Sequence, residues 1–409
     1  MRLGWVDFSD AERDKALNIL HMLQEQGAVD ELGIGVVRDA FADVFFPGTS
    51  TLLTRAKYYL VVPYIMREKI AEGAKAGWTV RQTMEEIDKA ERKLGEKFWK
   101  AHQGEIDCGV IGRMAIAHHG WVKRAPSELY WNGIRTFGIC GEREYSLPQY
   151  VSAALMTRRA KGAGLGTAAV GEADGGDDVD AGGLLRFKPF DLHGVYRKNW
   201  FSDVDIALRP EEARYLREKI LANVPDSLFA VVLRENIELE QFNGDFVAFA
   251  EYVSKFVDKP MRDMLELACY FMRIVYGARV RYNVILQGDR SDRALKRWQD
   301  IPQRELVPEI GMMDQVFKVL DLLGKPQYAR LFKFLLDLEH SFTDRTCEKT
   351  DILIREREKA IKGSARAKLL HSEKFSAENW VGGYYLDYRL SETARIVSDI
   401  YAGLGVQHA

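Results

Sequence analysis

The sequence predicts a mainly α, multi-helical protein with few short strands, and three observations carry this prediction. Apolar residues recur at helical spacing along most of the chain. Helix start and stop signals, such as Pro47-Gly48 and Pro210 followed by two glutamates, separate the periodic segments. No segment has the alternation and turn residues that are typical of a β-hairpin, so short strands are expected only near Gly183–Lys188.

In the first half of the chain, each expected helix is an apolar stripe bounded by a cap, a proline or a glycine. Pro63 removes a backbone donor, so the helix that contains it is expected to end near Val62 or to kink there. The expected helices in chain order are one that is capped by Ser9 and reaches Leu23, then Val37–Phe45, Leu52–Leu60, Thr79–His102 and a short helix from Pro126.

The second half shows the same helical spacing with longer segments. Proline at the first helical turn and acids near the positive end of the helix dipole mark the start at Pro210. The expected helices are Pro210–Leu221, Pro260–Tyr282, Met312–Leu323, Gln327–His340, Glu348–Leu370 and Glu392–Leu404.

A glycine-rich and acidic stretch without periodicity divides the two halves. Its composition is typical of a flexible linker or long loop. The sequence therefore predicts an N-terminal helical domain over residues 1–160, a linker over 161–183 and a C-terminal helical domain over 184–409.

Composition places the chain of 409 residues among globular proteins, because 47% of its residues are apolar and 29% are charged. The formal net charge of −2 shows no whole-chain basic excess, so any nucleic-acid binding must come from local patches. The N-terminal stretch has no apolar region typical of a signal peptide, and no apolar run is long enough to cross a bilayer. We expect a cytoplasmic protein without a membrane segment or a cofactor.

The stretch FFPGTSTLLTRAKYY suggests an anion-binding helix start. Thr49 or Ser50 can cap the helix, its first backbone N–H groups point outward, and Arg55 lies about one turn in. The alternative needs no ligand: the hydroxyl satisfies the N–H groups and Arg55 pairs with Asp39 or Asp43. Both interpretations stay open at this point.

Several segments together resemble an uncharacterised bacterial family, catalogued as a domain of unknown function. The segments are GWVDFS, DELGIGVVRDAF, FPGTSTLLTRAKYY, APSELYWNGIRTFGI, YGARVRYNVIL and LDYRLSETARIVSDI. Genes of similar proteins lie near helicase, nuclease or methyltransferase genes of the phage-defence type. The resemblance therefore implies a role in antiviral defence, with defence proteins such as a helicase or nuclease as partners, and it implies no catalytic residue.

A search for catalytic motifs identifies no complete set of residues. The serine-hydrolase elbow G-x-S-x-G and the zinc helix H-E-x-x-H are both absent from the sequence. Adjacent His118 and His119 point to different sides of a helix, and no acid cluster joins them, so no metal site is predicted. Glu91 and Lys93 form an E-x-K triplet, but it lies in a charged helix, which favours a solvated helix face. Enzymatic activity stays undecided, with a metal-dependent nuclease as the least favoured hypothesis.

Basic patches in the second half of the chain are the best-supported candidate sites. Residues 345–374 contain nine Lys and Arg against five Asp and Glu. Within them, Arg355, Lys359, Lys362 and Arg366 fall on one helix side, a row that matches successive phosphates. Alternatively, helical neighbours neutralise the row, since acids lie four residues before Arg355 and Lys362. A second cluster, also predicted to contact nucleic acid, comprises Arg279, Arg281, Arg290, Arg293, Lys296 and Arg297.

A third candidate region places Tyr130, Trp131 and Arg135 on the short helix that begins at Pro126. Such a helix can stack a base or enter a groove, and it can equally dock a partner protein. We therefore expect these three residues at an interface.

These observations favour a non-catalytic nucleic-acid-binding or adaptor component of a bacterial anti-phage defence assembly, with DNA as a candidate partner. The alternatives are a protein–protein scaffold without nucleic-acid contact and an unrecognised nuclease.

Overall fold

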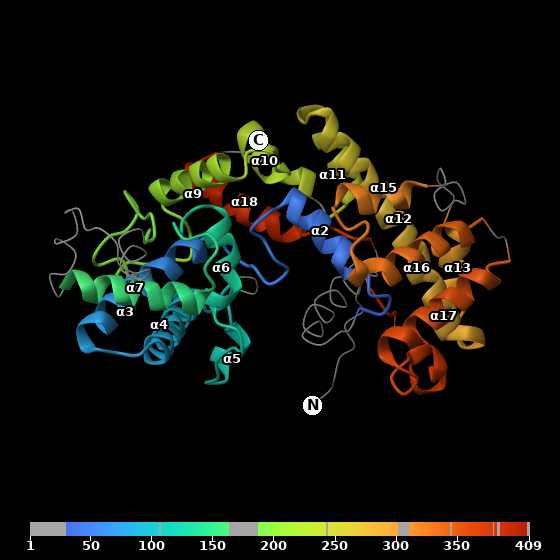
Figure 1. The fold of residues 1–409 in the computed structure, drawn as a ribbon, viewed down its shortest axis with the longest axis horizontal. Coiled ribbons are helices and arrows are strands. Elements are labelled where there is room, and N and C mark those ends of the chain that lie inside the picture. The colour runs from blue at the N-terminus through green and yellow to red at the C-terminus, as the bar shows by residue number, and fades with distance from the viewer. Residues whose placement is uncertain are drawn as a thin grey trace, which may run out of the picture. The chain divides into compact units, whose positions relative to one another are not determined.

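The structure is a computed structural model, and it describes residues 30–105, 108–162, 187–242, 244–301, 311–343, 346–378, 380–382 and 385–406. The fold is mainly α, as predicted (Figure 1). In the described part of the chain, the only β-type pairing is an isolated antiparallel bridge between Cys140 and Phe190. The expected helix after Ser9 and most of the glycine-rich stretch lie outside the described residues.

The chain divides into two compact units, each built from two separate parts of the sequence. Unit 1 comprises residues 1–40 and 263–386, and unit 2 comprises residues 41–262 and 387–409. This division differs from the predicted one, which placed a single boundary in the glycine-rich stretch. In unit 2, the C-terminal helix α18 (Leu390–Leu404) packs against α9 (Pro210–Asn223). Contacts between segments so far apart in the sequence leave no trace in local composition.

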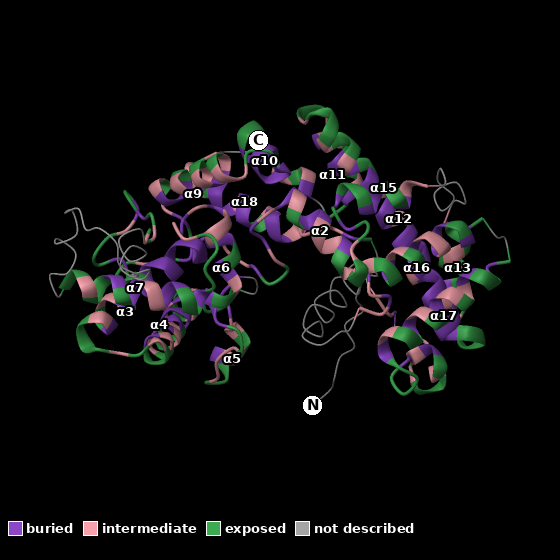
Figure 2. Cartoon of the chain, viewed as in Figure 1, coloured by how far each residue is buried: buried purple, intermediate pink, exposed green. Residues whose placement is uncertain are grey.

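Helix α3 (Tyr58–Ala76) is the centre of unit 2. It packs against α4 (Val80–Ala101), α6 (Pro126–Thr136) and α7 (Leu147–Gly162). Its first nine residues are all buried, as expected for a helix that is apolar on every side (Figure 2). Pro63 lies inside the helix and does not end it.

The stretch before α3 folds differently from the prediction. Helix α2 (Gly35–Phe45) ends before Pro47-Gly48 as expected, but α3 begins at Tyr58 rather than near Leu52. Gly48 has a φ of +78°, and a Cβ there would lie 2.8 Å from the Phe137 ring. Only glycine fits this turn without strain, because it needs both a positive φ and close approach of the backbone.

The rest of unit 2 consists of short helices. These helices are α5 (Arg113–Ala117), α10 (Leu228–Glu235), η1 (Leu239–Phe242), α11 (Phe246–Val253) and η2 (Ser254–Phe256). Tyr388 lies between the rings of Phe41 and Phe246, with ring centroids 5.5 and 4.7 Å away. Aromatic pairs at these distances add to the free energy gained from burial.

Unit 1 contains most of α12 (Lys259–Gln287), which crosses the boundary between the units, followed by α13 (Arg293–Asp300), α15 (Met312–Val319), α16 (Ala329–Ser341) and α17 (Glu348–Lys362). The single turns η3 (Gly288–Arg290) and η4 (Pro326–Tyr328) lie between these helices, and η5 (Lys368–Leu370) and η6 (Ser372–Lys374) follow α17. Helix α17 ends at Gly363, with a φ of +75°, so it is shorter than the predicted Glu348–Leu370. None of the described helices in either unit is long and apolar enough to span a bilayer.

Candidate functional site

Five of the predicted nucleic-acid-binding arginines lie on or beside α12 and α13, and the structure divides them by environment. Arg281 is only 8% exposed and makes a bidentate ion pair with Asp351, with Nη2–Oδ distances of 2.8 and 2.6 Å. Its guanidinium also lies 5.1 Å from the centre of the Trp298 ring. Because Asp351 neutralises Arg281 inside unit 1, this arginine has no charge to offer a phosphate. The alternative interpretation of the α17 row had paired Asp351 with Arg355.

Arg293 and Arg297, by contrast, are exposed and rest on aromatic rings. Arg297 donates from Nε to the Tyr276 hydroxyl at 2.5 Å, and the guanidinium of Arg293 lies 5.9 Å from the centre of the Trp380 ring. Tyr385 stacks on Tyr276 with ring centroids 4.2 Å apart. We call these five residues, Tyr276, Arg293, Arg297, Trp380 and Tyr385, the aromatic–arginine cluster.

The backbone near Trp380 is fixed to α12, and this positions the cluster. Asn283 donates to the Val381 carbonyl and accepts from the Val381 N–H, both at 2.8 Å. The Asn283 side chain is itself fully buried. Next to this contact, Gly382 has a φ of +80°, and a Cβ there would lie 3.6 Å from the Arg279 side chain. Arg279 therefore lies beside the same short segment.

The predicted row of cations along α17 contains both buried and exposed side chains. Lys362 is buried and pairs with Glu31 and, at 3.3 Å, with Glu358. Glu358 is itself fully buried and accepts hydrogen bonds from the Tyr282 hydroxyl and from the backbone N–H of Leu369. Lys362 therefore joins structural elements of unit 1 and is not part of a surface row.

The other cations of this region stay at the surface. Lys359 is exposed and makes no hydrogen bond or ion pair with any described residue. Arg355 donates to the Leu369 carbonyl at 3.3 Å, and Arg366 donates to the Lys362 carbonyl at 3.1 Å. Arg290 donates to the Phe375 carbonyl at 2.7 Å, so Arg290 and Arg355 hold the same segment that follows α17. A carbonyl orients a guanidinium without cancelling its charge, which leaves these arginines available to an anion.

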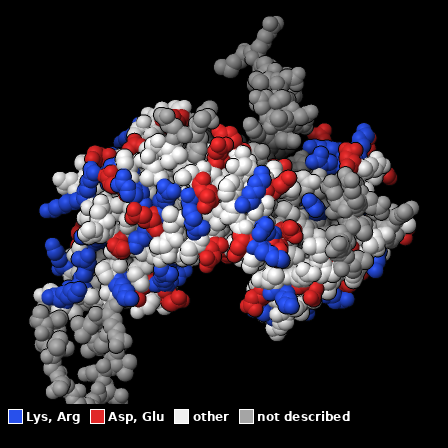
Figure 3. All heavy atoms as spheres, turned by 90° about the horizontal axis from the view of Figure 1, so that it is seen from above, with Lys and Arg blue, Asp and Glu red and all other residues white. Residues whose placement is uncertain are grey.

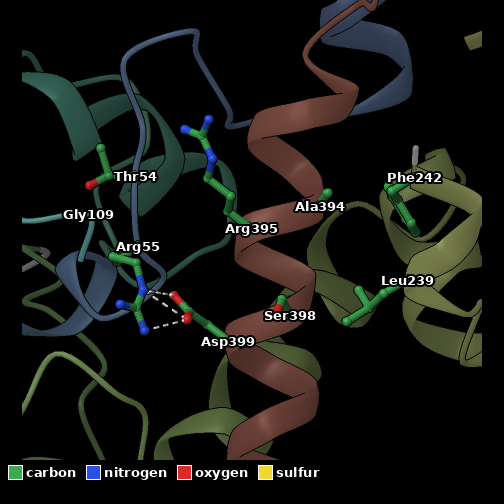
Figure 4. A pocket seen from close by; sticks show the side chains of 9 residues that line it. All are labelled: Thr54, Arg55, Gly109, Leu239, Phe242, Ala394, Arg395, Ser398 and Asp399. Carbon is green, nitrogen blue, oxygen red and sulfur yellow. Dashed lines mark hydrogen bonds and ion pairs between the residues drawn. The ribbon is translucent and has the colours of Figure 1, made fainter. Parts of the chain in front are cut away.

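Arg55 was predicted to bind an anionic ligand. In the structure it binds the carboxylate of Asp399. Arg55 donates from Nε to both oxygens of Asp399 on α18, at 2.9 and 3.0 Å (Figure 4). It also donates from Nη1 to the Cys108 carbonyl at 2.9 Å. Burial disfavours the charge of Arg55, but the hydrogen bonds and charge of Asp399 outweigh it and raise the pKa of the guanidinium. Neither Asp39 nor Asp43 is the partner that was expected; Asp43 pairs with Arg389 instead.

Thr49 and Ser50 do not cap a helix at this place. The Thr49 hydroxyl donates to the Phe46 carbonyl at 2.6 Å, and α3 begins eight residues after Ser50 without a side-chain cap. The predicted anion site at Thr49, Ser50 and Arg55 is therefore not assembled in the described structure, because its arginine turns toward Asp399.

The predicted interface residues Tyr130, Trp131 and Arg135 hold unit 2 together instead. Tyr130 is fully buried, accepts from the N–H groups of Thr54 and Arg55 at 3.0 and 3.1 Å, and donates to the Arg55 carbonyl at 2.9 Å. Trp131 is 6% exposed, and its indole donates to the Tyr145 carbonyl. Arg135 donates to the Arg143 carbonyl. The aromatic residues of this helix face the core, which sequence spacing alone did not distinguish from an interface.

Sequence reasoning did not identify Asp399, Trp380 or Tyr385. Asp399 shares the segment SETARIVSDI with apolar residues, and nothing local links it to Arg55. Trp380 and Tyr385 belong to WVGGYYLDY, whose density of aromatic and glycine residues was a usable signal for a stacking surface. No group of three or more His, Cys, Asp or Glu side chains within the described ranges is arranged to hold a metal ion.

On the face shown in Figure 3, basic and acidic side chains are interspersed, in agreement with the net charge of −2. The structure is that of a mainly α protein. Its candidate nucleic-acid-binding cations form small local groups rather than one large basic surface on the face shown in Figure 3. Residues 1–155 match the model of a family of unknown function, DUF6361. Searches of curated proteins and of solved structures found no significant match.

Proposed function

We propose that the chain is a non-catalytic component that binds nucleic acid through the aromatic–arginine cluster of unit 1. A partner protein such as a helicase or a nuclease would supply catalysis. The place of this component in a bacterial anti-phage defence assembly rests on the resemblance of its sequence segments to the uncharacterised family, since that family's genes lie near defence genes.

The observation that carries the proposal is the exposed ring of Tyr385 beside two exposed arginines. Tyr385 is 48% exposed and stacks on Tyr276, which fixes the orientation of its ring. A base on such a ring contributes about 1–3 kcal/mol, and nearby guanidinium groups add phosphate contacts. Stacking requires an unpaired base, so we propose single-stranded nucleic acid or an unpaired region as the ligand.

The exposed cations beside α17 support a path for the backbone. Arg290, Arg355 and Arg366 are oriented by carbonyl oxygens and keep their charge. An arginine that is already oriented loses less side-chain entropy when it binds a phosphate. Arg281 and Lys362 are excluded from this path by their internal ion pairs.

The test is fluorescence anisotropy of a labelled thymidine oligonucleotide of about 15 nucleotides at several salt concentrations. Tyr385→Ala is expected to weaken binding by roughly 5-fold to 150-fold, which corresponds to about 1–3 kcal/mol. Tyr145→Ala is the matched control, because Tyr145 is a similarly exposed tyrosine of unit 2 and should leave affinity unchanged. Equal affinities for the two variants, or no binding at low salt, would contradict the proposal.

A protein–protein scaffold is the second candidate, and one observation favours it. Ile352 on α17 is 55% exposed, and Arg355 and Lys359 lie three and seven residues later on the same helix face. An apolar side chain flanked by cations is typical of a protein interface. Co-purification of a partner that is lost with Ile352→Glu but kept with Tyr385→Ala would support the scaffold.

A further inference from the structure

Unit 2 contains a hollow of about 430 Å³ beside the Arg55–Asp399 pair. Its wall comes from four separate parts of the chain: Thr54 and Arg55, Gly109, the turn η1, and helix α18. Cavities of roughly 300–1,000 Å³ at such junctions are the usual size for small-molecule sites. The hollow is not part of the proposed nucleic-acid surface, which belongs to unit 1.

The two sides of the hollow differ in chemistry. Figure 4 shows α18 between them, with Thr54, Arg55 and Arg395 on one side and the side chains of Leu239 and Phe242 on the other. Ala394 and Ser398 lie one helical turn apart on α18 and are small, which leaves the space open.

The charges that line the hollow sum to an excess of one positive charge. Arg55 and Asp399 cancel each other through bonds of 2.8–3.0 Å. Arg395 is exposed and makes no hydrogen bond or ion pair with any described residue. The neighbouring Arg55 is held rigidly, so a charged ligand would meet one fixed and one adjustable guanidinium.

We propose that this hollow binds a small aromatic anion, a carboxylate or a phosphate monoester. The anionic group pairs with Arg395 at the polar side of the hollow. The aromatic part extends over Ala394 and Ser398 toward Leu239 and Phe242, where apolar burial and ring–ring contact stabilise it.

The experiment is isothermal titration calorimetry of the full chain with benzoate and adenosine 5′-monophosphate, and with neutral adenosine in parallel. At least one of the two anions is expected to bind, and adenosine should bind about tenfold more weakly than adenosine 5′-monophosphate if the phosphate supplies affinity. Arg395→Gln should lower the affinity for the anion by about tenfold without changing the urea midpoint. Arg214→Gln, an exposed arginine of unit 2 without a partner in the described residues, is the control.

A second variant tests the cavity independently of charge. Ser398→Leu should fill the floor of the hollow and abolish binding while Arg395 is kept. A phosphate monoester and a carboxylate are distinguished by which probe binds. Binding of neither anion, or unchanged affinity in both Arg395→Gln and Ser398→Leu, would overturn the proposal.

Discussion

Two cations in unit 2 pair with carboxylates, whereas two exposed cations in unit 1 lie over aromatic rings. In unit 2, Lys57 is 3% exposed and pairs with Glu212 at 2.6 Å, and Arg55 is held by Asp399. In unit 1, Arg293 and Arg297 lie over the rings of Trp380 and Tyr276. A carboxylate cancels the charge of its partner, whereas an aromatic ring stabilises a cation and leaves its charge in place.

The pairs with internal carboxylates identify basic residues that stabilise the fold. Arg281 and Lys362 belong to unit 1 but follow the unit 2 pattern, because each pairs with an internal carboxylate. A basic residue in a sequence is therefore informative about nucleic-acid binding only when its partner is known.

The largest expected effect is on the buried pair of unit 2. Glu212→Gln leaves the ammonium of Lys57 buried and without a counter-charge, and burial already lowers the pKa of Lys57. We expect a loss of about 3–5 kcal/mol in the free energy of unfolding, measured by urea denaturation. Glu211→Gln is the control, since Glu211 pairs with Arg197 at the surface and should cost about 0–1 kcal/mol. Similar losses of unfolding free energy in Glu212→Gln and Glu211→Gln would contradict the contrast between buried and surface ion pairs.

A smaller effect separates the two kinds of arginine within unit 1. Arg281→Gln breaks a charge-assisted, largely buried interaction and should cost about 1–3 kcal/mol of stability, with little change in the salt dependence of oligonucleotide binding. Arg297→Gln should change stability by less than about 0.5 kcal/mol. It should reduce the slope of log affinity against log salt by about 0.7, the value for one phosphate contact of a single strand. A larger loss of stability in Arg297→Gln, together with a reduced salt slope in Arg281→Gln, would refute this distinction between the two arginines.

A third effect depends on pH and concerns an acid buried in unit 2. Glu91 is 1% exposed, and its carboxyl oxygens lie 2.7 and 3.0 Å from the backbone nitrogen and hydroxyl of Ser127. Burial raises the pKa of Glu91 to about 8, although the Ser127 hydrogen bonds act against this shift. The folded state therefore holds a proton that the unfolded state releases, and stability should fall as the pH rises from the ordinary glutamate range toward about 8.

Glu91→Gln should flatten that pH dependence, because the amide is neutral at every pH. Urea unfolding at a series of pH values measures it, with Glu96→Gln on the exposed face of α4 as the control. An unchanged slope in Glu91→Gln would show that another group carries the proton.

Much of the fold was predictable, because helical spacing and caps are local. Helices α4, α9 and α12 begin within a residue or so of their predicted starts at Thr79, Pro210 and Pro260. The start of α3 was not predictable from Thr49 and Ser50, because a buried turn with Gly48 against Phe137 determines it.

The candidate site was only partly predictable. A spacing of four residues places Arg293 and Arg297 on one helix face, and the structure shows both as exposed. Their aromatic partners were not predictable, since Trp380 and Tyr385 lie more than eighty residues later in the chain. The same holds for Asp399, which lies 344 residues after Arg55.

The most direct test of the nucleic-acid surface is photo-cross-linking of the full chain to a 4-thiothymidine oligonucleotide, followed by peptide mass spectrometry. Our account predicts cross-links at Tyr385 or Trp380 and on the peptide that carries Arg293 and Arg297. Cross-links confined to unit 2, or none under conditions where anisotropy reports saturation, would contradict it.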